Sequence, residues 1–320
     1  MSVTYSFVVP VYNEEEIISD FYQELSRVAV ELRETYEIIF STGGNTDRTL
    51  NILRQFHQKD AAVKIINMSD RFDYQAALKA GLDHSRGKAV ITLDGDLQHP
   101  PRLIPLLIEE WKKGFDIVYT IREDTKHENI FKRTGSKIFY FVLKILTKLN
   151  LEENAADFRL MSRKAVDALK QFPERKRYIP GIISLIGFNR TGIRYECPQR
   201  TKGRSKFAFM RMLSLALDGI FSFSNTPIRI VTFIGFIMTF FSFIYLIYVV
   251  LVSFQHPNVS PGWASILACI LLFSSLQITI LGLLGEYIGR IYEETKHRPI
   301  YIVDELIGFE QKCSTSKIRG

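Results

Sequence analysis

The chain has 320 residues, a formal net charge of +7 and three cysteines, at positions 197, 269 and 313. The positive charge is modest and lies beside apolar stretches, and no nucleic-acid-binding motif occurs, which disfavours a nucleic-acid-binding protein. The cysteines show no metal or redox spacing and leave an odd count, so we expect reduced structural thiols and assign them no role.

Charged residues divide the chain into two unlike parts. Up to about residue 229 they are interspersed with apolar residues, whereas residues 230–285 contain no Lys, Arg, Asp or Glu. This contrast predicts a soluble domain followed by a membrane domain. Residues 1–11 lack the basic start and long apolar core of a signal peptide, so we expect the large domain to stay cytoplasmic.

The first 120 residues alternate between short apolar strands and helices. We expect strands at residues 5–11, 37–40, 63–67, 90–94 and 116–120. Helices are expected between them, at residues 14–33, 46–56, 74–84 and 103–113. This alternation predicts an α/β domain with a doubly wound, mainly parallel sheet and right-handed crossovers.

Residues 90–101 read Val-Ile-Thr-Leu-Asp-Gly-Asp-Leu-Gln-His-Pro-Pro. The apolar run predicts a buried strand that delivers Asp94 and Asp96 to the carboxyl edge of the sheet, where open α/β sheets bind ligands. Carboxylate oxygens are the ligands that Mg²⁺ or Mn²⁺ prefers, and such an ion could hold a diphosphate. Ordinary turn chemistry is the alternative interpretation.

Four motifs occur in order, at residues 7–14 (Phe-Val-Val-Pro-Val-Tyr-Asn-Glu), 45–49 (Asn-Thr-Asp-Arg-Thr), 75–81 (Gln-Ala-Ala-Leu-Lys-Ala-Gly) and 94–101. They resemble the successive motifs of family 2 glycosyltransferases. The likeness is greatest to polyprenyl-phosphate glycosyltransferases, the group that contains dolichyl-phosphate mannose synthase and bacterial undecaprenyl-phosphate glucosyltransferases. The resemblance covers nearly the whole chain and implies a GT-A-type domain that binds a nucleotide-diphosphate sugar.

The resemblance also implies roles for individual residues. The nucleotide-sugar pocket would be lined by Pro10, Tyr12, Glu14 and Asp94. The metal, Mg²⁺ or Mn²⁺, would be held by Asp94, Asp96 and Gln98. One departure concerns residues 41–45, Ser-Thr-Gly-Gly-Asn, where the family usually has two aspartates. Either Thr42 or the backbone of the two glycines takes over nucleotide recognition, or donor specificity is altered; a merely flexible turn is the alternative.

Three further stretches concern the acceptor. Residues 128–151 and 207–223 are apolar with basic flanks, which predicts amphipathic helices at the membrane interface, although the first could instead pack on the sheet. Asp157, within residues 154–160, resembles a family aspartate near the acceptor, and a helix cap is the alternative. Residues 200–206 match the element of this family that binds the acceptor phosphate; a plain patch for anionic lipids is the alternative.

These features thus give two sets of expected site residues. The expected phosphate ligands are Arg122, Arg133, Arg200, Ser205 and Lys206. The expected catalytic residues are Asp94, Asp96, Asp157 and Arg200.

Residues 230–254 and 263–285 are each long enough to cross a bilayer core, which predicts a two-helix transmembrane hairpin. The loop between them carries no Lys or Arg, whereas basic residues flank the hairpin, so we expect both termini in the cytoplasm. The expected parts are therefore residues 1–127 for the nucleotide sugar and metal, 128–229 for the acceptor, 230–285 for the hairpin and 286–320 for a polar, helical cytoplasmic tail.

Together these features predict an inverting transfer of a hexose, glucose, from a UDP-sugar to undecaprenyl or another polyprenyl phosphate at the cytoplasmic face of the inner membrane. A phosphate acceptor has a second pKa of about 6, so it is already nucleophilic at neutral pH and needs to be positioned more than deprotonated. Asp157 would therefore orient the acceptor or an arginine rather than remove a proton from the acceptor. The alternatives are another donor such as GDP-mannose, a processive polysaccharide synthase, whose Arg-Trp pair is absent here, and a non-catalytic scaffold. Self-association is expected because relatives often form homo-oligomers.

Overall fold

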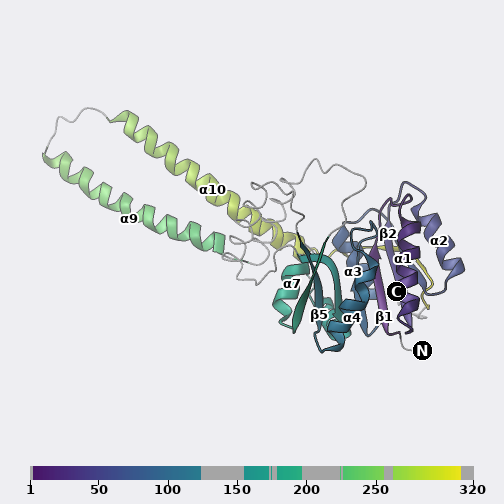
Figure 1. The fold of residues 1–320 in the computed structure, drawn as a ribbon. Helices are drawn as coiled ribbons and strands as arrows, with labels where there is room; N and C mark the ends of the chain where they lie inside the picture. The colour runs from purple at the N-terminus through teal and green to yellow at the C-terminus, as the bar shows by residue number, and fades with distance from the viewer. Residues whose placement is uncertain are drawn as a thin grey trace, which may run out of the picture. The chain divides into compact units, whose positions relative to one another are not determined.

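The computed structural model of the chain describes residues 3–123, 155–172, 174, 179–196, 224, 226–255 and 262–310. These residues belong to two compact units (Figure 1). The first unit falls within Met1–Tyr140, Asn150–Lys206 and Pro299–Gly320, and the second within Phe141–Leu149 and Phe207–Arg298.

The first unit is an α/β domain built on an eight-stranded sheet. Its strands are β1 (Tyr5–Pro10), β2 (Tyr36–Gly43), β3 (Val63–Met68), β4 (Ala89–Thr92), β5 (Ile117–Glu123), β6 (Ala155–Ser162), β7 (Arg190–Glu196) and β8 (Val303–Ile307). Its helices are α1 (Ile18–Glu31), α2 (Thr49–Lys59), α3 (Tyr74–His84), the 3₁₀ turn η1 (Pro101–Leu103), α4 (Ile104–Lys112), α6 (Arg163–Lys170) and α7 (Ile179–Ile186). The strand order is β7-β5-β6-β4-β1-β2-β3-β8.

The strands form a core on both faces because successive side chains alternate in direction. Ile38 and Ile65 belong to the larger core cluster, which also contains residues of α1, α2 and α4. Their neighbours Ile39 and Ile66 belong to a second cluster with residues of α3. This two-sided burial explains why the strands read as continuous apolar runs, and it confirms the predicted α/β class.

The expectation of a mainly parallel sheet holds for the centre and fails at the sides. Strands β4, β1, β2 and β3 pair in parallel, as predicted. However, β6 lies between β4 and β5 and is antiparallel to both, so β5 does not continue the doubly wound order. Strand β7 then pairs in parallel with β5. The sheet is mixed because β6 and β8 run antiparallel to their neighbours. The local pattern of residues 154–160 did not indicate that β6 would insert between β4 and β5.

Residues 286–320 differ from the polar, helical tail that was expected. Helix α10 continues to Thr295, and Val303–Ile307 form β8, which pairs antiparallel with β3 at the edge of the sheet. Tyr301, Val303 and Phe309 pack against the cluster that contains Ile39 and Ile66. The chain beyond the apolar stretch therefore contributes to the α/β domain, while the four predicted domain ranges stay predictions.

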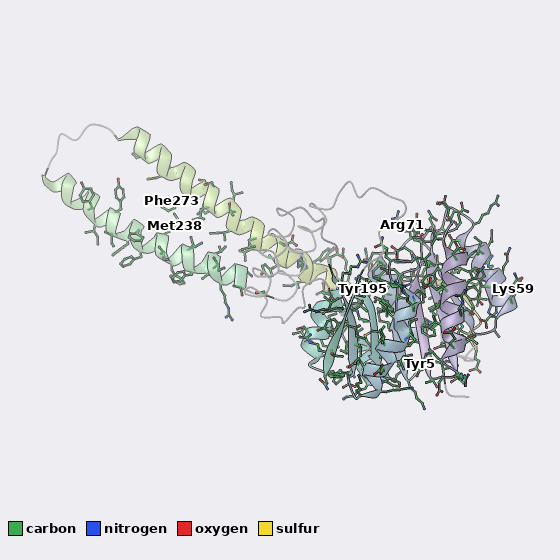
Figure 2. All side chains as sticks on the ribbon, viewed as in Figure 1. Tyr5, Lys59, Arg71, Tyr195, Met238 and Phe273 are labelled. Atoms are coloured by element: carbon green, nitrogen blue, oxygen red, sulfur yellow. The ribbon has the colours of Figure 1, made fainter. Side chains whose placement is uncertain are left out.

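The second unit contains two long helices, α9 (Thr226–Gln255) and α10 (Trp263–Thr295). Among the described residues, Ile228–Tyr245 of α9 is long and apolar enough to cross a membrane, and none of that window is buried. Its large side chains are exposed, with Phe233 at 66% and Phe236 at 72%. Figure 2 draws these exposed side chains along both helices, with Met238 and Phe273 labelled. The hairpin of two spanning helices remains a prediction.

Candidate functional site

The two aspartates of residues 90–101 lie on a tight loop between β4 and η1. Because β1, β2 and β4 run in parallel, their carboxyl ends meet at the same edge of the sheet, where this loop lies. The loop is closed by two hydrogen bonds: the Asp94 backbone N–H donates to His99 Nδ1 at 3.0 Å, and the Gln98 N–H donates to Asp96 Oδ1 at 3.1 Å. Leu97 takes a φ of +60°, which an aliphatic side chain rarely adopts.

Asp94 stands at the centre of this site, with about 30% of its side chain exposed. Tyr74, the first residue of α3, donates its hydroxyl to Asp94 Oδ1 at 2.7 Å. Burial, followed by the negative charges of Asp157 and Asp94, raises the pKa of Tyr74 well above its ordinary value, so the hydroxyl keeps its proton. Burial is also the main cause that raises the pKa of Asp94 to about 6; the Tyr74 hydrogen bond opposes it, and the charges of Asp157 and Asp96 add to it.

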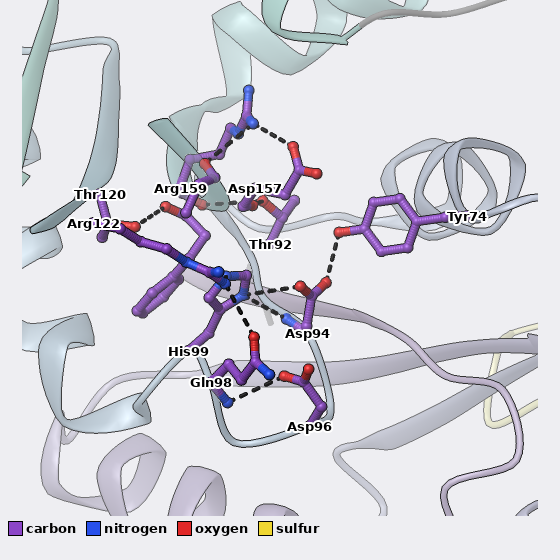
Figure 3. Close-up of polar contacts among 12 residues, drawn as sticks. Tyr74, Thr92, Asp94, Asp96, Gln98, His99, Thr120, Arg122, Asp157 and Arg159 are labelled. Carbon is purple, nitrogen blue, oxygen red and sulfur yellow. Dashed lines mark hydrogen bonds and ion pairs between the residues drawn. The ribbon is translucent and has the colours of Figure 1, made fainter. Parts of the chain in front are cut away.

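Asp157 reaches this site from β6. In the antiparallel register Thr92 lies opposite Arg159, so Asp157, two residues before Arg159, falls opposite Asp94, two residues after Thr92. The Thr92 hydroxyl donates to the Asp157 carbonyl at 2.7 Å. Arg159, only 4% exposed, forms an ion pair with the Asp157 carboxylate (Figure 3). The insertion of β6 beside β4 is therefore what brings Asp157 to the loop that carries Asp94 and Asp96.

Arg122, near the end of β5, points into the same group of side chains (Figure 3). Its Nε donates to the Tyr195 hydroxyl at 3.2 Å, and its Nη2 donates to Gln98 Oε1 at 3.4 Å. The same Nη2 lies 3.3 Å from His99 Nε2. Burial, followed by the charges of Arg122 and Arg159, lowers the pKa of His99 to about 3, so the ring is neutral and its 3.3 Å approach to Asp94 is not an ion pair.

The motif at residues 45–49 braces the loop that follows β1. The Asn13 backbone N–H donates to Asn45 Oδ1 at 3.1 Å, and the Glu14 N–H donates to Thr49 Oγ1 at 2.9 Å. Asn45 Nδ2 in turn donates to Thr42 Oγ1 at 2.6 Å, so the buried Thr42 hydroxyl is tied to this brace. The motif therefore positions the loop that carries the expected nucleotide-pocket residues.

The glycine pair in the altered stretch is required by close packing. A Cβ on Gly43 would lie 2.5 Å from the Asp70 carbonyl oxygen, and one on Gly44, whose φ is +62°, would lie 2.6 Å from the Arg71 nitrogen. Arg71 also covers the Tyr12 ring, with its guanidinium carbon 4.2 Å from the ring centroid. In Figure 2 Arg71 lies toward the edge of the domain opposite Tyr5. The loops after β1, β2 and β3 thus form one wall, which a merely flexible turn would not require.

The structure brings together five of the predicted site residues: Asp94, Asp96, Gln98, Arg122 and Asp157. Pro10, Tyr12, Glu14 and Thr42 lie at the neighbouring ends of β1 and β2. Arg133, Arg200, Ser205 and Lys206 fall outside the described residues, as do both predicted interface helices. The sequence interpretation missed Tyr74, His99 and Arg159. The last two lie inside quoted motifs, which was a usable signal, but nothing local distinguished Tyr74 from an ordinary first helical residue.

The donor set of the loop fits a divalent cation that a substrate helps to bind. Among the described residues no group of three or more His, Cys, Asp or Glu side chains is placed to hold a metal ion by itself. Asp94, Asp96 and the Gln98 amide oxygen offer hard donors but an incomplete shell, and Mg²⁺ commonly uses one or two carboxylates with water and substrate phosphates. Mutual repulsion of the carboxylates helps to raise the pKa of Asp94, and a cation would relieve it.

The sequence of this chain is similar to those of known glycosyltransferases. The family model described as Glycosyl transferase family 2 matches residues 6–170. The chain is 40% identical to the uncharacterized glycosyltransferase YkcC of Bacillus subtilis (strain 168), over 97% of this chain and 96% of that protein. It is also 40% identical to the bactoprenol glucosyl transferase of Shigella phage SfV, over 93% of this chain and 97% of that protein.

A solved structure also resembles this chain. Glucosyl-3-phosphoglycerate synthase from Mycobacterium tuberculosis, in complex with Mn²⁺, uridine diphosphate and phosphoglyceric acid, gives a TM-score of 0.51 at 18% identity. The match covers 69% of this chain and 78% of that one. This likeness supports a GT-A-type α/β fold with a mixed sheet.

Proposed function

This chain belongs to glycosyltransferase family 2 and is therefore a glycosyltransferase, and we propose that it transfers glucose from a UDP-sugar to polyprenyl phosphate with inversion at the sugar. One observation carries the proposal: the similarity to bactoprenol glucosyl transferases covers 93% of the chain, so it includes the long apolar helices as well as the sheet. A lipid-linked acceptor lies in a membrane, which the apolar helices could enter, whereas a soluble acceptor would not require such helices.

The donor half of the reaction uses the loop after β4. Asp94, Asp96 and Gln98 would hold a divalent cation, which would neutralise the charge that develops on the leaving diphosphate. The hydrogen bond from the Gln98 backbone N–H to Oδ1 of Asp96 fixes the orientation of the Asp96 carboxylate. Tyr12, with Arg71 on its ring, and the braced loop after β1 bind the nucleotide.

The acceptor half uses charge and placement. A lipid phosphate is anionic at neutral pH and already nucleophilic, so the protein must hold it in line with the sugar rather than activate it. Arg122, which contacts Gln98 and Tyr195, supplies a cation beside the donor site for this purpose. Asp157 is held by Arg159, so it orients the acceptor side and does not need to take a proton. Arg133, Arg200, Ser205 and Lys206 complete the phosphate site.

The test is a transfer assay with the full-length chain in lipid nanodiscs. Radiolabelled UDP-glucose, UDP-galactose, UDP-N-acetylglucosamine and GDP-mannose are each offered with undecaprenyl phosphate. We expect a chloroform-soluble product from UDP-glucose, with a β-linked sugar from the α-linked donor. A product from GDP-mannose alone would overturn the donor assignment, and donor binding without any lipid product would overturn the acceptor assignment.

The membrane arrangement predicts a labelling pattern. In a variant that lacks the three native cysteines, Asn258→Cys lies in the loop between the two spans and Ser314→Cys lies near the end of the chain. Because the flanking basic residues favour the cytoplasmic side, an impermeant thiol reagent added to intact cells should label position 258 and not position 314. Permeabilised cells provide the control, since both positions should then react. The reverse pattern in intact cells would overturn the cytoplasmic placement of the catalytic domain.

The raised pKa of Asp94 predicts that donor binding depends on pH. The ionised carboxylate binds the cation, and a pKa of about 6 leaves most of it ionised at pH 7 and about one-tenth at pH 5. The affinity for UDP-glucose with Mn²⁺, measured by calorimetry, should therefore fall about tenfold from pH 7 to pH 5. UDP-glucose is used because its diphosphate diester does not titrate in this range. An affinity that is constant between the two pH values would contradict the role of Asp94.

A further inference from the structure

We infer that Tyr74 and His99 are positioning residues that fix the Asp94 carboxylate for the donor diphosphate and its cation. The inference rests on the proposed function and adds two residues that neither the sequence motifs nor the comparisons assign. Figure 3 shows that the two side chains approach Asp94 from opposite sides. His99 holds its backbone and Tyr74 holds its carboxylate.

His99 acts through the backbone of the loop. Its Nδ1 accepts the Asp94 N–H at 3.0 Å, which fixes the point where the chain turns away from the sheet. The ring is 1% exposed and stacks on Phe158 of β6, with ring centroids 5.4 Å apart. A side chain held this firmly is a rigid acceptor, so the Asp94 nitrogen and Cα have a fixed position relative to β6.

The loop requires such an anchor because it is strained. Leu97 adopts a φ of +60°, a conformation that costs an aliphatic residue free energy and persists only where its surroundings enforce it. The hydrogen bonds from the Asp94 and Gln98 N–H groups enforce it here from both ends of the turn. Without the acceptor on His99, the loop can relax and carry both carboxylates away from the diphosphate.

Tyr74 acts on the carboxylate itself. Its hydroxyl donates to Oδ1 of Asp94 at 2.7 Å, which selects one rotation of the carboxylate and leaves Oδ2 and the second lone pair of Oδ1 for the cation. The position of α3 determines whether the Tyr74 hydroxyl can contact Asp94. Asp73 caps this helix by accepting from the Ala76 N–H at 2.7 Å, and Gly81 lets it approach β1 so closely that a Cβ there would clash with Val8.

Three substitutions separate these roles from a general effect on folding. Tyr74→Phe removes only the hydroxyl. His99→Phe keeps an aromatic ring against Phe158 but has no acceptor, whereas His99→Asn loses the ring and keeps an oxygen at the same distance from Cβ as Nδ1. The matched control is Tyr22→Phe, because the Tyr22 hydroxyl also donates to a carboxylate, that of Asp60, at 3.0 Å.

The measurements are the affinity for UDP-glucose with Mn²⁺ by calorimetry, the Mn²⁺ concentration that gives half-maximal transfer, and kcat. Losing a hydrogen bond to a charged carboxylate, as in Tyr74→Phe, or leaving a backbone N–H without its acceptor, as in His99→Phe, should cost about 10- to 100-fold. Each of these two variants should therefore raise the half-maximal Mn²⁺ concentration and weaken metal-dependent binding within that range. His99→Asn should stay within about fivefold of the native protein, and Tyr22→Phe should leave both values unchanged.

The outcomes distinguish this inference from the proposed function. If the native chain binds no UDP-glucose and transfers no glucose, the proposed function fails. If the native chain is active and Tyr74→Phe and His99→Phe bind UDP-glucose with Mn²⁺ as it does, the positioning roles are wrong. If His99→Phe and His99→Asn weaken metal-dependent binding equally, the role of Nδ1 as an acceptor is wrong.

Discussion

Asp96→Asn is expected to reduce glucose transfer at least about 1000-fold, equivalent to about 4 kcal/mol of transition-state stabilisation. The substitution removes one of the two carboxylate charges offered to the cation, while the Asn oxygen can still accept from the Gln98 N–H that closes the loop. The loop should therefore keep its shape and lose its affinity for the cation. Transfer is measured at saturating Mg²⁺ or Mn²⁺, with unfolding monitored in parallel.

The control for this prediction is Asp20→Asn, which neutralises an exposed carboxylate in the first turn of α1. That variant should transfer glucose at the native rate. Full activity of Asp96→Asn, or native activity that persists in excess chelator, would contradict the role of Asp96 as a ligand of the cation.

The central elements could be predicted because each satisfies a local rule. Helix α3 begins at Tyr74 and ends at His84, the range expected from the sequence, and Asp73 caps its start. The strands that carry the donor loops are short runs buried on both faces, and their carboxyl ends meet wherever such strands pair in parallel. The position of Asp94 and Asp96 at that edge therefore followed from sequence alone.

The sides of the sheet could not be predicted because strand order is not a local property. Residues 155–162 have the composition of a strand, but nothing in them specifies whether they join outside β5 or between β5 and β4. The outcome matters for the site, since only the inner position sets Asp157 opposite Asp94. The contact of Tyr74 with Asp94 likewise depends on how closely α3 packs on β1.

Strand β8 shows the same limit at the other edge. Its five residues, Val-Asp-Glu-Leu-Ile, do not alternate strictly between charged and apolar side chains, and such a short mixed segment also suits a surface helix or a loop. What makes it a strand is the free edge of β3, which lies more than 230 residues earlier in the chain and offers unpaired N–H and C=O groups. Arg54 of α2 also forms an exposed ion pair with Glu305 of β8, at 2.5 Å.

Removing residues 299–320 is therefore expected to destabilise the α/β domain severely, although the missing segment follows the long helices. Four partly buried apolar side chains leave the domain: Tyr301, Val303, Ile307 and Phe309. At about 1–2 kcal/mol each, their loss costs about 4–8 kcal/mol, and a domain of this kind has only about 5–15 kcal/mol in total. The exposed edge of β3 should also promote aggregation. Urea unfolding followed by the fluorescence of Trp111, in a Trp263→Phe background, measures the loss.

Point substitutions in β8 distinguish packing from the mere presence of the segment. Ile307 pairs with Ile65 and packs against the main core, whereas its neighbour Leu306 is 44% exposed on the opposite face of the strand. Ile307→Ala should lower the free energy of unfolding by about 1–3 kcal/mol. This is less than the same substitution costs at a fully buried isoleucine, because Ile307 is only partly buried. Leu306→Ala should change it by less than about 0.5 kcal/mol. Equal effects of the two, or a truncated chain that unfolds at the native urea concentration, would mean that β8 does not stabilise the sheet.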